Sequence, residues 1–380
     1  MTKNTNRLLS LDIFRGMTVA FMIIVNTPGC LWEYAYPPLL HAEWHGCTPT
    51  DLVFPFFLFI VGVSTFFSLK KYGGEINSDS VMRILRRTLL IFAVGVFLTI
   101  FPHFIRDYSN LRIFGVLQRI ALAYGIGAII CLIVRRDFLW VAVAVLLLGY
   151  WALLALAGGA DPYALETNLA LKVDLAVVGA NHLYQGFGIP FDPEGLLSTI
   201  PAVATVIIGY FTGGMIASVK KGDSKIVLKL MLLGAALFGL GSLWGVVFPI
   251  NKALWTSSYT LYTAGLGIIV FAMIYFLADV LKFQKWGVFF IIFGTNAIFA
   301  YTLATAWANT MLAIEFTGGG ENLTLYSWIF QNVFVPFAGN TNGSLLFAIT
   351  QLMLVWVITL ILYRKKIFLK LLSQLRTIEI

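Results

Sequence analysis

The chain has 380 residues, of which 59% are hydrophobic and only 12% are charged, and its mean hydropathy is +0.87. A soluble domain carries about 25% charged residues. This composition excludes a water-soluble globular protein, because too little polar material remains to cover a water-facing surface. It indicates an all-α protein embedded in the lipid bilayer.

Apolar runs that are long enough to cross a membrane recur along the whole chain. A spanning helix needs about 20 largely apolar residues. The sequence predicts ten such helices, at residues 11–29, 50–69, 84–102, 113–134, 138–157, 196–218, 226–248, 258–280, 286–309 and 343–363. Most connections between them are short, so we expect one polytopic helix bundle that forms a single transmembrane domain over residues 1–380.

The cationic residues divide unequally between the two sides of this predicted bundle. The even-numbered connections and the two chain ends carry 20 of them: Lys3, Arg7, Lys70, Lys71, Arg83, Arg86, Arg87, Arg135, Arg136, Lys220, Lys221, Lys225, Lys229, Lys282, Lys285, Arg364, Lys365, Lys366, Lys370 and Arg376. The odd-numbered connections carry four: Arg106, Arg112, Lys172 and Lys252. Cytoplasmic loops carry such an excess. We therefore expect both termini in the cytoplasm of a multi-pass protein of the plasma (inner) membrane. The unequal distribution of cations across the membrane accounts for the net charge of +8. We therefore expect no nucleic-acid partner.

Three longer segments, at about residues 30–49, 158–195 and 310–342, fall on the outer side of the predicted bundle. They carry aromatic residues, glycine and proline, and long ordered loops are more often functional than not. We therefore expect the chemistry on polar substrates at the outer face. Cys30 and Cys47 also fall there, where a disulfide is permitted; free thiols are the alternative.

The first predicted helix carries polar residues that are costly in lipid. Asp12 and Arg15 are three residues apart and share a face, so they can pair. Asn26 lies eleven residues beyond Arg15, close to three full turns, and so falls on the same face roughly 16 Å further out. This stripe predicts a polar path inside the bundle. An intrahelical ion pair with a polar helix end is the structural alternative.

Two histidines and two carboxylates crowd the end of the first outer segment: His41, Glu43, His45 and Asp51. Histidine is the usual general base near neutral pH. Asp51 also fits a capping box with Thr48 at the start of the second helix, and the two roles are compatible. A zinc site from both histidines and a carboxylate is a weaker alternative, because no third histidine or cysteine stands at ligand spacing.

The fourth and ninth predicted helices also contain polar residues. Gln118 and Arg119 lie in the fourth, and Arg119 is roughly 10–12 Å from its outer end. At that depth Arg119 needs a partner, such as Asp12, Asp51 or an anionic ligand; a buried salt bridge between helices is the structural alternative. Asn296 lies near the middle of the ninth helix.

Further polar candidates flank the later helices on the outer side. Asp192 with Pro193 fits a cap at the start of the sixth helix. His182 and Glu194 are less easily explained by capping, and Trp255 stands just before the eighth helix.

Short segments scattered in order over nearly the whole chain carry a family resemblance: Leu11–Val19, His41–Gly46 with Asp51–Pro55, Gly115–Arg119, His182–Gln185, Phe191–Gly195, Pro249–Lys252 and Gly294–Asn296. Together they resemble the transmembrane acyltransferases related to heparan-α-glucosaminide N-acetyltransferase, including bacterial relatives. The resemblance implies an enzyme that takes acetyl groups from cytoplasmic acetyl-CoA and acetylates an amino sugar on the far side. It places the family's active histidine on His41, its polar residue at the outer end of the first helix on Asn26, and its first-helix arginine motif on Asp12 and Arg15.

These observations lead to one set of expected roles. The expected catalytic residues are His41 as general base, Asn26 and Asp51. Acetyl-CoA, as co-substrate and without a metal, is expected to contact Asp12, Arg15, Gln118, Arg119 and Asn296. An amino sugar or saccharide acceptor is expected to contact Glu43, His45, His182, Asp192, Glu194 and Trp255. The rival hypothesis is a secondary transporter of a small polar or sugar-like solute, since charges inside a bundle are equally typical of carriers. The sequence is compatible with either a homodimer or a monomer.

Overall fold

The computed structural model describes residues 8–70, 76–104, 108–159, 161–318 and 321–369. The cationic residues Lys3, Arg7, Lys71, Arg106, Lys370 and Arg376, which enter the predicted topology, lie outside these ranges.

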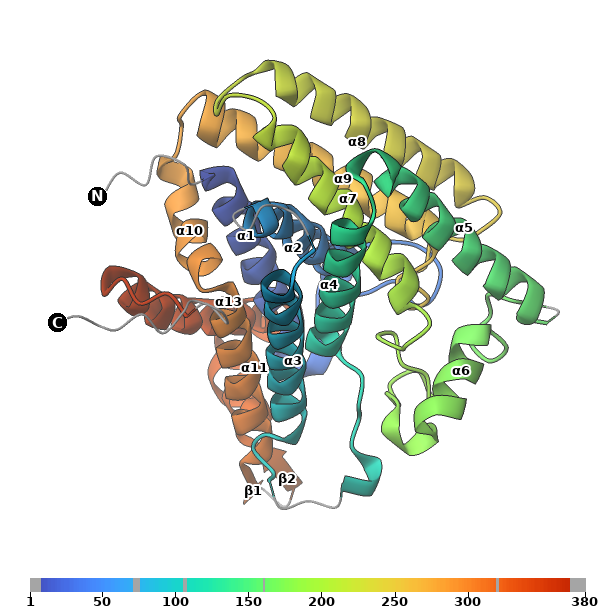
Figure 1. Cartoon of the computed structure of the whole chain (residues 1–380). Helices are drawn as coiled ribbons and strands as arrows, with labels where there is room; N and C mark the ends of the chain where they lie inside the picture. The colour runs from blue at the N-terminus through green and yellow to red at the C-terminus, as the bar shows by residue number, and fades with distance from the viewer. Residues whose placement is uncertain (1–7, 71–75, 105–107, 160, 319–320, 370–380) are drawn as a thin grey trace.

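Long helices make up most of the described chain (Figure 1). The α-helices are α1 (Leu9–Asn26), α2 (Val53–Lys70), α3 (Ser78–Ile100), α4 (Val116–Ile133), α5 (Leu139–Ala157), α6 (Leu169–Val178), α7 (Thr199–Ala217), α8 (Lys225–Trp244), α9 (Ser257–Tyr275), α10 (Val288–Thr295), α11 (Ala297–Ala313), α12 (Leu325–Ile329) and α13 (Val335–Arg364). Two π-helical turns, η7 (Phe276–Val280) and η9 (Phe330–Phe334), extend α9 and join α12 to α13. Short 3₁₀ helices are η1 (Gly29–Trp32), η2 (Pro37–Leu39), η3 (Pro49–Leu52), η4 (Tyr108–Asn110), η5 (Arg136–Phe138), η6 (Ala180–His182) and η8 (Lys285–Gly287).

The predicted helical bundle is confirmed, and the chain is a multi-pass membrane protein. Eight described helical stretches are long and apolar enough to cross a membrane: Leu9–Asn26, Pro49–Lys70, Val116–Ile133, Arg136–Ala157, Thr199–Ala217, Lys225–Trp244, Ser257–Val280 and Leu325–Arg364. A ninth span results if α10 and α11 count as one bent span. The 23-residue α3 coincides with the third predicted helix, but it carries three arginines in its first half and falls outside this set. The count of ten stays a prediction.

Two of the predicted helices have a different form from the one expected. The segment 286–309 is not one straight helix: α10 ends at Thr295, Asn296 leaves the helical region (φ −129°, ψ 39°), and α11 continues at an angle of 72°. The last span begins at Leu325 rather than 343 and is interrupted at Gly339, where φ is +74°. The third outer segment also forms a small antiparallel sheet of β1 (Glu315–Gly318) and β2 (Glu321–Thr324), which the expectation of an all-α chain omitted.

Glycines bring the central helices into direct backbone contact. A Cβ atom on Gly62 of α2 would lie 2.1 Å from the Val206 carbonyl oxygen of α7. A Cβ atom on Gly294 of α10 would lie 1.9 Å from the Asp12 carbonyl oxygen of α1. Small residues permit such close packing where lipid gives helices no hydrophobic reason to associate. This packing fixes α1 and α2 at the centre of the bundle, where Figure 1 shows them surrounded by α4, α7, α9 and α10.

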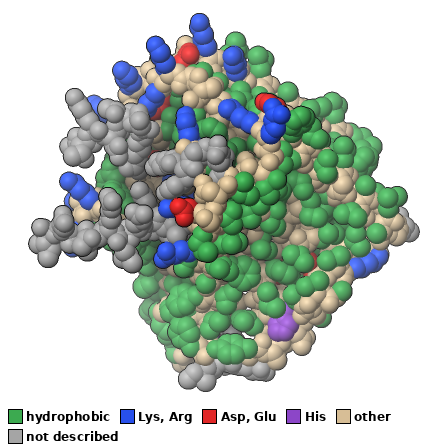
Figure 2. Space-filling model, viewed as in Figure 1, with side chains coloured by type: hydrophobic (Ala, Val, Ile, Leu, Met, Phe, Trp, Pro, Cys, Tyr) green, Lys and Arg blue, Asp and Glu red, His purple; other side chains and the backbone are tan. Residues whose placement is uncertain are grey.

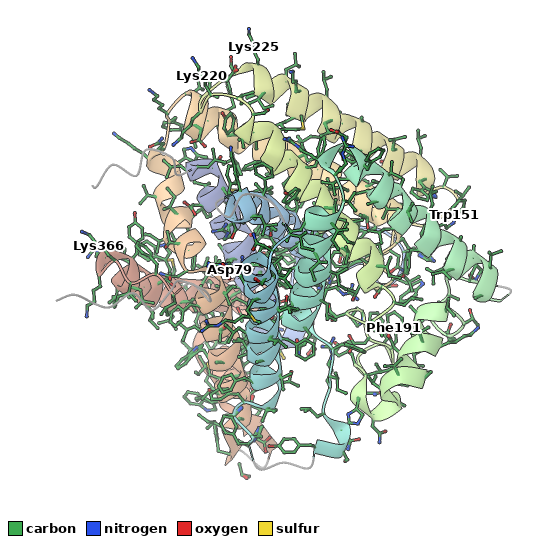
Figure 3. All side chains as sticks on the ribbon, viewed as in Figure 1. Asp79, Trp151, Phe191, Lys220, Lys225 and Lys366 are labelled. Carbon is green, nitrogen blue, oxygen red and sulfur yellow. The ribbon has the colours of Figure 1, made fainter. Side chains whose placement is uncertain are left out.

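The cationic side chains and the mostly hydrophobic part of this surface lie apart. Figure 2 shows Lys and Arg side chains gathered along the upper and left edges of the molecule, while its lower right is mostly hydrophobic. In Figure 3, Lys220, Lys225 and Lys366 mark the cationic edges, whereas Trp151 and Phe191 lie on the opposite side. This separation agrees with the predicted orientation, which places the cationic connections in the cytoplasm.

Candidate functional site

The side chains of His41 and Asp51 form a close pair at the start of α2. The His41 Nδ1 atom lies 2.6 Å from Asp51 Oδ1. Asp51 is 1% exposed, whereas the His41 side chain is 47% exposed. The carboxylate therefore fixes the imidazole with Nδ1 protonated, which leaves Nε2 as the basic nitrogen.

The local sequence explains why Asp51 can hold this position. Its second oxygen, Oδ2, accepts the backbone N–H groups of Ala42 (3.1 Å) and Thr48 (2.9 Å) and the Thr48 hydroxyl (3.0 Å). The Thr48 contact is the predicted capping box, with Pro49 at the first helical position of η3. Asp51 thus caps the helix through one oxygen and orients His41 through the other, so the two expected roles coexist.

Lys252 completes this cluster from the connection between α8 and α9. Its Nζ atom lies 3.0 Å from His41 Nε2 and 3.9 Å from Asp51 Oδ1. Burial lowers the pKa of Lys252, while the carboxylates of Glu194 and Asp51 act in the opposite direction. The ammonium group therefore lies against both the base and its carboxylate partner.

A tight turn positions Lys252. The Asn251 side chain accepts the backbone N–H of Leu254 at 2.8 Å, and the Trp255 N–H donates to the Lys252 carbonyl at 3.0 Å. Trp255 adopts a φ of +49°, a conformation that is rare for a bulky residue and marks functional sites more often than others. The Asn251 amide also lies 3.3 Å from His45 Nδ1, which ties the turn to the first outer segment.

A second charged cluster lies at the N-terminal ends of α4 and α7. Arg112 donates to both carboxylate oxygens of Asp192 at 2.8 Å and to Glu194 at 2.6 Å. Both acids are nearly buried, at 1% and 7% exposure, and the guanidinium lies 4.7 Å from the centre of the Tyr184 ring. Burial alone would lower the pKa of Arg112, but Asp192 and Glu194 raise it overall.

Arg119 lies between the two clusters and is fully buried. It donates to the Gly195 carbonyl at 2.9 Å and to the Ser198 hydroxyl at 2.5 Å. Its guanidinium carbon is 5.2 Å from the centre of the Trp255 ring. The expected carboxylate partners are not the ones found: Arg119 contacts a carbonyl and a hydroxyl because the loop before α7 folds over it.

Four buried nitrogen atoms on and beside this arginine lack partners among the described residues. Arg119 Nε and Nη1, Gln118 Nε2 and Trp255 Nε1 have no hydrogen-bond partner within the described part of the chain. Buried donors without partners are rare in native proteins and call for an explanation such as a ligand or an ordered water.

The polar stripe of α1 lies apart from these two clusters and has other contacts. Arg15 pairs with Asp12 at 3.6 Å, as its spacing predicted, and also donates to Ser64 of α2 at 2.6 Å. It donates at 3.2 Å to the carbonyl of Gly294, near the end of the broken α10. A cation there satisfies a carbonyl that the bend leaves without its helical partner. Arg15 therefore links three helices at the bend.

Comparison with known proteins identifies the family. The family profile described as heparan-alpha-glucosaminide N-acetyltransferase, catalytic, matches residues 7–244. This covers well over half of the chain. The chain belongs to this family.

Two curated relatives carry the same name. The human heparan-alpha-glucosaminide N-acetyltransferase is 28% identical over 431 aligned positions, which cover 96% of this chain and 60% of the human protein. The mouse protein is 27% identical over 357 positions, covering 78% of this chain and 53% of the mouse protein. The chain thus spans between half and two thirds of the length of these relatives.

Of the residues expected to act in this acetyltransferase family, the structure brings several together. His41 and Asp51 form one cluster, Asp192 and Glu194 the other, and Arg119 lies between them. Their functional roles stay predictions.

Other expected residues are placed less directly. Asn26 is exposed at the last residue of α1, and Glu43 is exposed in the first outer segment. His182 uses Nδ1 to bind the Leu111 carbonyl at 2.7 Å, and so holds the segment that carries Arg112.

Two expected ligand contacts have mainly structural surroundings. The Asn296 side chain donates to the Ile367 carbonyl at 3.1 Å and accepts the Leu369 N–H at 2.8 Å, so the segment after α13 occupies its amide. Trp255 is 1% exposed and packs edge-on against Phe54 and Tyr259. These contacts favour supporting roles for both residues.

Three residues of this region were not expected from the sequence to act in the site: Lys252, Arg112 and Asp174. Lys252 and Arg112 were counted only as outer charges, although Lys252 lies in a segment that carries the family resemblance. Asp174 of α6 is 1% exposed and accepts the Leu196 N–H at 2.8 Å, directly beside Gly195. Burial raises its pKa to about 7, although the Leu196 N–H acts in the opposite direction. No sequence pattern near Asp174 indicates this contact.

His45, Cys30 and Cys47 have ordinary surroundings. Partial burial lowers the pKa of His45. Burial raises the pKa of the Cys47 thiol to about 12, which makes it a poor nucleophile near neutral pH. Cys30 and Cys47 are free thiols, and no group of three metal-ligating side chains occurs among the described residues.

Proposed function

We propose that the protein transfers an acetyl group from cytoplasmic acetyl-CoA to a glucosamine-type amino sugar at the outer face of the plasma (inner) membrane. Family membership supports acetyl transfer as the reaction. The observation that carries the proposal is the His41 imidazole, which a buried carboxylate holds in one tautomer with its basic Nε2 directed away from that carboxylate. The whole chain acts as a single transmembrane domain.

His41 acts as the general base. Its Nε2 atom takes a proton from the acceptor amine as the amine nitrogen forms a bond to the thioester carbonyl carbon. When the carbon–sulfur bond breaks, the same proton passes to the leaving sulfur, so that coenzyme A leaves as a thiol. Asp51 stays ionised and stabilises the imidazolium that forms between these steps, as a carboxylate does in a catalytic triad.

Lys252 supplies the positive charge that this reaction needs. The carbonyl oxygen becomes negative in the tetrahedral intermediate, and preorganised donors at such an oxygen contribute about 3–4 kcal/mol each. The ammonium lies within hydrogen-bond distance of His41 Nε2, at 3.0 Å, so the acceptor amine must displace it from this nitrogen. The displaced ammonium then lies beside the carbonyl oxygen. Asn26, at the outer end of α1, is the expected second donor to the carbonyl.

The acetyl-CoA arm is expected to pass along the polar stripe of α1. A small apolar cavity of about 10 Å³ lies on that stripe, lined by Met22, Phe57, Leu117 and Tyr301 among others. A cavity of this size holds at most one water, so these side chains must move apart to admit the arm. The unsatisfied N–H groups of Arg119 and its neighbours are suited to donate hydrogen bonds to the carbonyl oxygens of its amide and thioester groups.

The acceptor site is expected at the second cluster and the first outer segment. An amino sugar binds as an ammonium and releases one proton to solvent before it attacks as the neutral amine. Glu43 is exposed beside His41 and His45 in the chain, and Glu194 lies close enough to Lys252 to affect its pKa. These carboxylates attract a cationic acceptor toward the base.

Acetyl transfer by the purified protein tests the proposal. The assay follows labelled acetyl-CoA and glucosamine in detergent for wild type, H41A and H103A. His103 is an exposed histidine on the same side of the membrane and is the matched control. Loss of a general base lowers the rate by about 10²–10⁴-fold. H41A at the wild-type rate, with H103A unchanged, would remove His41 from the reaction.

One observation favours the transporter alternative. Helices broken near mid-membrane are typical of carriers, whose half-helix ends bind ions and substrates, and α10 and α11 meet at 72° at Asn296. However, Arg15 already binds the Gly294 carbonyl at this bend, and the segment after α13 already binds the Asn296 side chain. Uptake of labelled glucosamine into proteoliposomes without chemical change, and without acetyl-CoA, would support the carrier.

A further inference from the structure

A cavity of about 360 Å³ lies between the C-terminal halves of α2 and α7, which are predicted to face the cytoplasm, and the start of η5. Its lining includes Phe66 and Lys70 of α2, Arg136 of η5, and Tyr210 and Gly214 of α7. Figure 1 shows α5, which continues η5, running close to α7. No described carboxylate lines this cavity.

The Arg136 guanidinium is held in a defined position at this cavity. Its central carbon lies 5.7 Å from the centre of the Phe66 ring and 5.9 Å from that of Phe211. A Cβ atom on Gly214 would lie 2.5 Å from Arg136 Nη2, so glycine leaves the space in which the guanidinium lies against α7. Two aromatic rings and a glycine thus fix a cation that has no ion pair with any described carboxylate.

The cavity is separate from the proposed acetyl-CoA path. Ser64 of α2 accepts the Arg15 guanidinium on the side that faces α1. Phe66 stands two residues later, which in an α-helix is a rotation of about 200°. The cavity therefore lies on the opposite side of α2 from the polar stripe of α1.

The lining indicates the class of ligand. Arg and Lys together bind phosphate oxygens, and Arg does so with several donors at once. Basic pockets between the cytoplasmic ends of membrane helices bind lipid head groups. The apolar side chains of Phe138 and Val141, which follow Arg136 along η5 and α5, are about half exposed and provide a surface for acyl chains. We propose that this cavity binds a phosphate group, and that its source is the head group of an anionic phospholipid of the cytoplasmic leaflet.

Binding to defined lipids tests this site. The protein in neutral detergent is titrated with phosphatidylglycerol or phosphatidylcholine, and the apparent melting temperature is followed. Phosphatidylglycerol should raise it and phosphatidylcholine should not, because a ligand of the folded state stabilises it by mass action. The variants are R136Q and K70Q with R135Q as the matched control, since Arg135 is the adjacent arginine, is 80% exposed and does not line the cavity.

Each lining cation that is removed should weaken phosphatidylglycerol binding about fivefold, whereas R135Q should bind as wild type does. Undiminished binding by R136Q and K70Q, or an equal response to both lipids, would overturn the proposal. If R136Q fails to fold, K70Q alone decides, because it changes only an exposed helix-terminal residue. In a last set of titrations, inorganic phosphate or coenzyme A at millimolar concentration replaces the lipid, and the same melting temperature is followed. If either reproduces the whole shift, and loses it in K70Q, the site binds a soluble phosphate and the lipid source is wrong.

Discussion

Replacing Arg112 by Gln should destabilise the protein through the two acids that it leaves behind. The substitution removes the three charge-assisted hydrogen bonds, of 2.6–2.8 Å, that Arg112 makes to Asp192 and Glu194. Breaking a buried ion pair by removing one partner costs about 3–5 kcal/mol. The Arg112 side chain is 30% exposed, so water reaches part of this cluster and we expect about 2–4 kcal/mol after screening.

The measurement is the apparent melting temperature of R112Q, of R135Q, and of a variant that combines R112Q with D192N and E194Q. At roughly 2 °C per kcal/mol for a chain of this size, R112Q should melt on the order of 5 °C below wild type. R135Q removes an exposed 3.9 Å pair with Asp137 and should change nothing measurable. The combined variant should recover part of the loss, because neutral amides do not repel each other. R112Q within 1 °C of wild type would show that the cluster contributes no net stability.

Three further predictions concern other parts of the molecule. Burial raises the pKa of Asp174 to about 7 from 3.8, so the folded state binds this proton more tightly than the unfolded state. The stability of wild type should therefore fall as pH rises from about 4 to about 7 and then level. D174N should flatten this pH dependence in melting curves. G294A should lose about 1–3 kcal/mol of stability in thermal unfolding, because its Cβ atom would lie 1.9 Å from the Asp12 carbonyl oxygen. G149A, which has open space around it, should be neutral or slightly stabilising. Equal losses in the two variants would contradict this packing. K252Q should lower kcat about a hundredfold to a thousandfold at nearly unchanged melting temperature, and an unchanged kcat would exclude Lys252 from the reaction.

Local sequence rules predicted the parts of the site that depend on neighbours in the chain. The spacing of Asp12 and Arg15 predicted their ion pair, and the spacing of Thr48 and Asp51 predicted the capping contact. Long apolar runs predicted most spans for the same reason, since each helix satisfies its own backbone in lipid.

The features that the sequence did not reveal depend on contacts between distant segments. Lys252 reaches His41 from more than 200 residues away, and no spacing within its own loop indicates this contact. The bend at Asn296 has no proline, and its exposed groups are satisfied by Arg15 and by the segment after α13. We expected Arg119 to pair with a carboxylate or an anionic ligand because a charge at that depth normally needs a partner; within the protein, the loop at Gly195 supplies a carbonyl.

Acetyl transfer across a sealed membrane tests the central claim most directly. Wild type and H41A are reconstituted into proteoliposomes, and vesicles of one orientation are selected by labelling an introduced cysteine at Asp223 or Glu43. Labelled acetyl-CoA is supplied only on the side of the cationic connections, and glucosamine only on the side of His41. We predict that wild type forms N-acetylglucosamine in the glucosamine compartment, that acetyl-CoA stays in its own compartment, and that H41A forms no product above background. Product that appears only on the acetyl-CoA side, or that forms equally with H41A, would contradict the account.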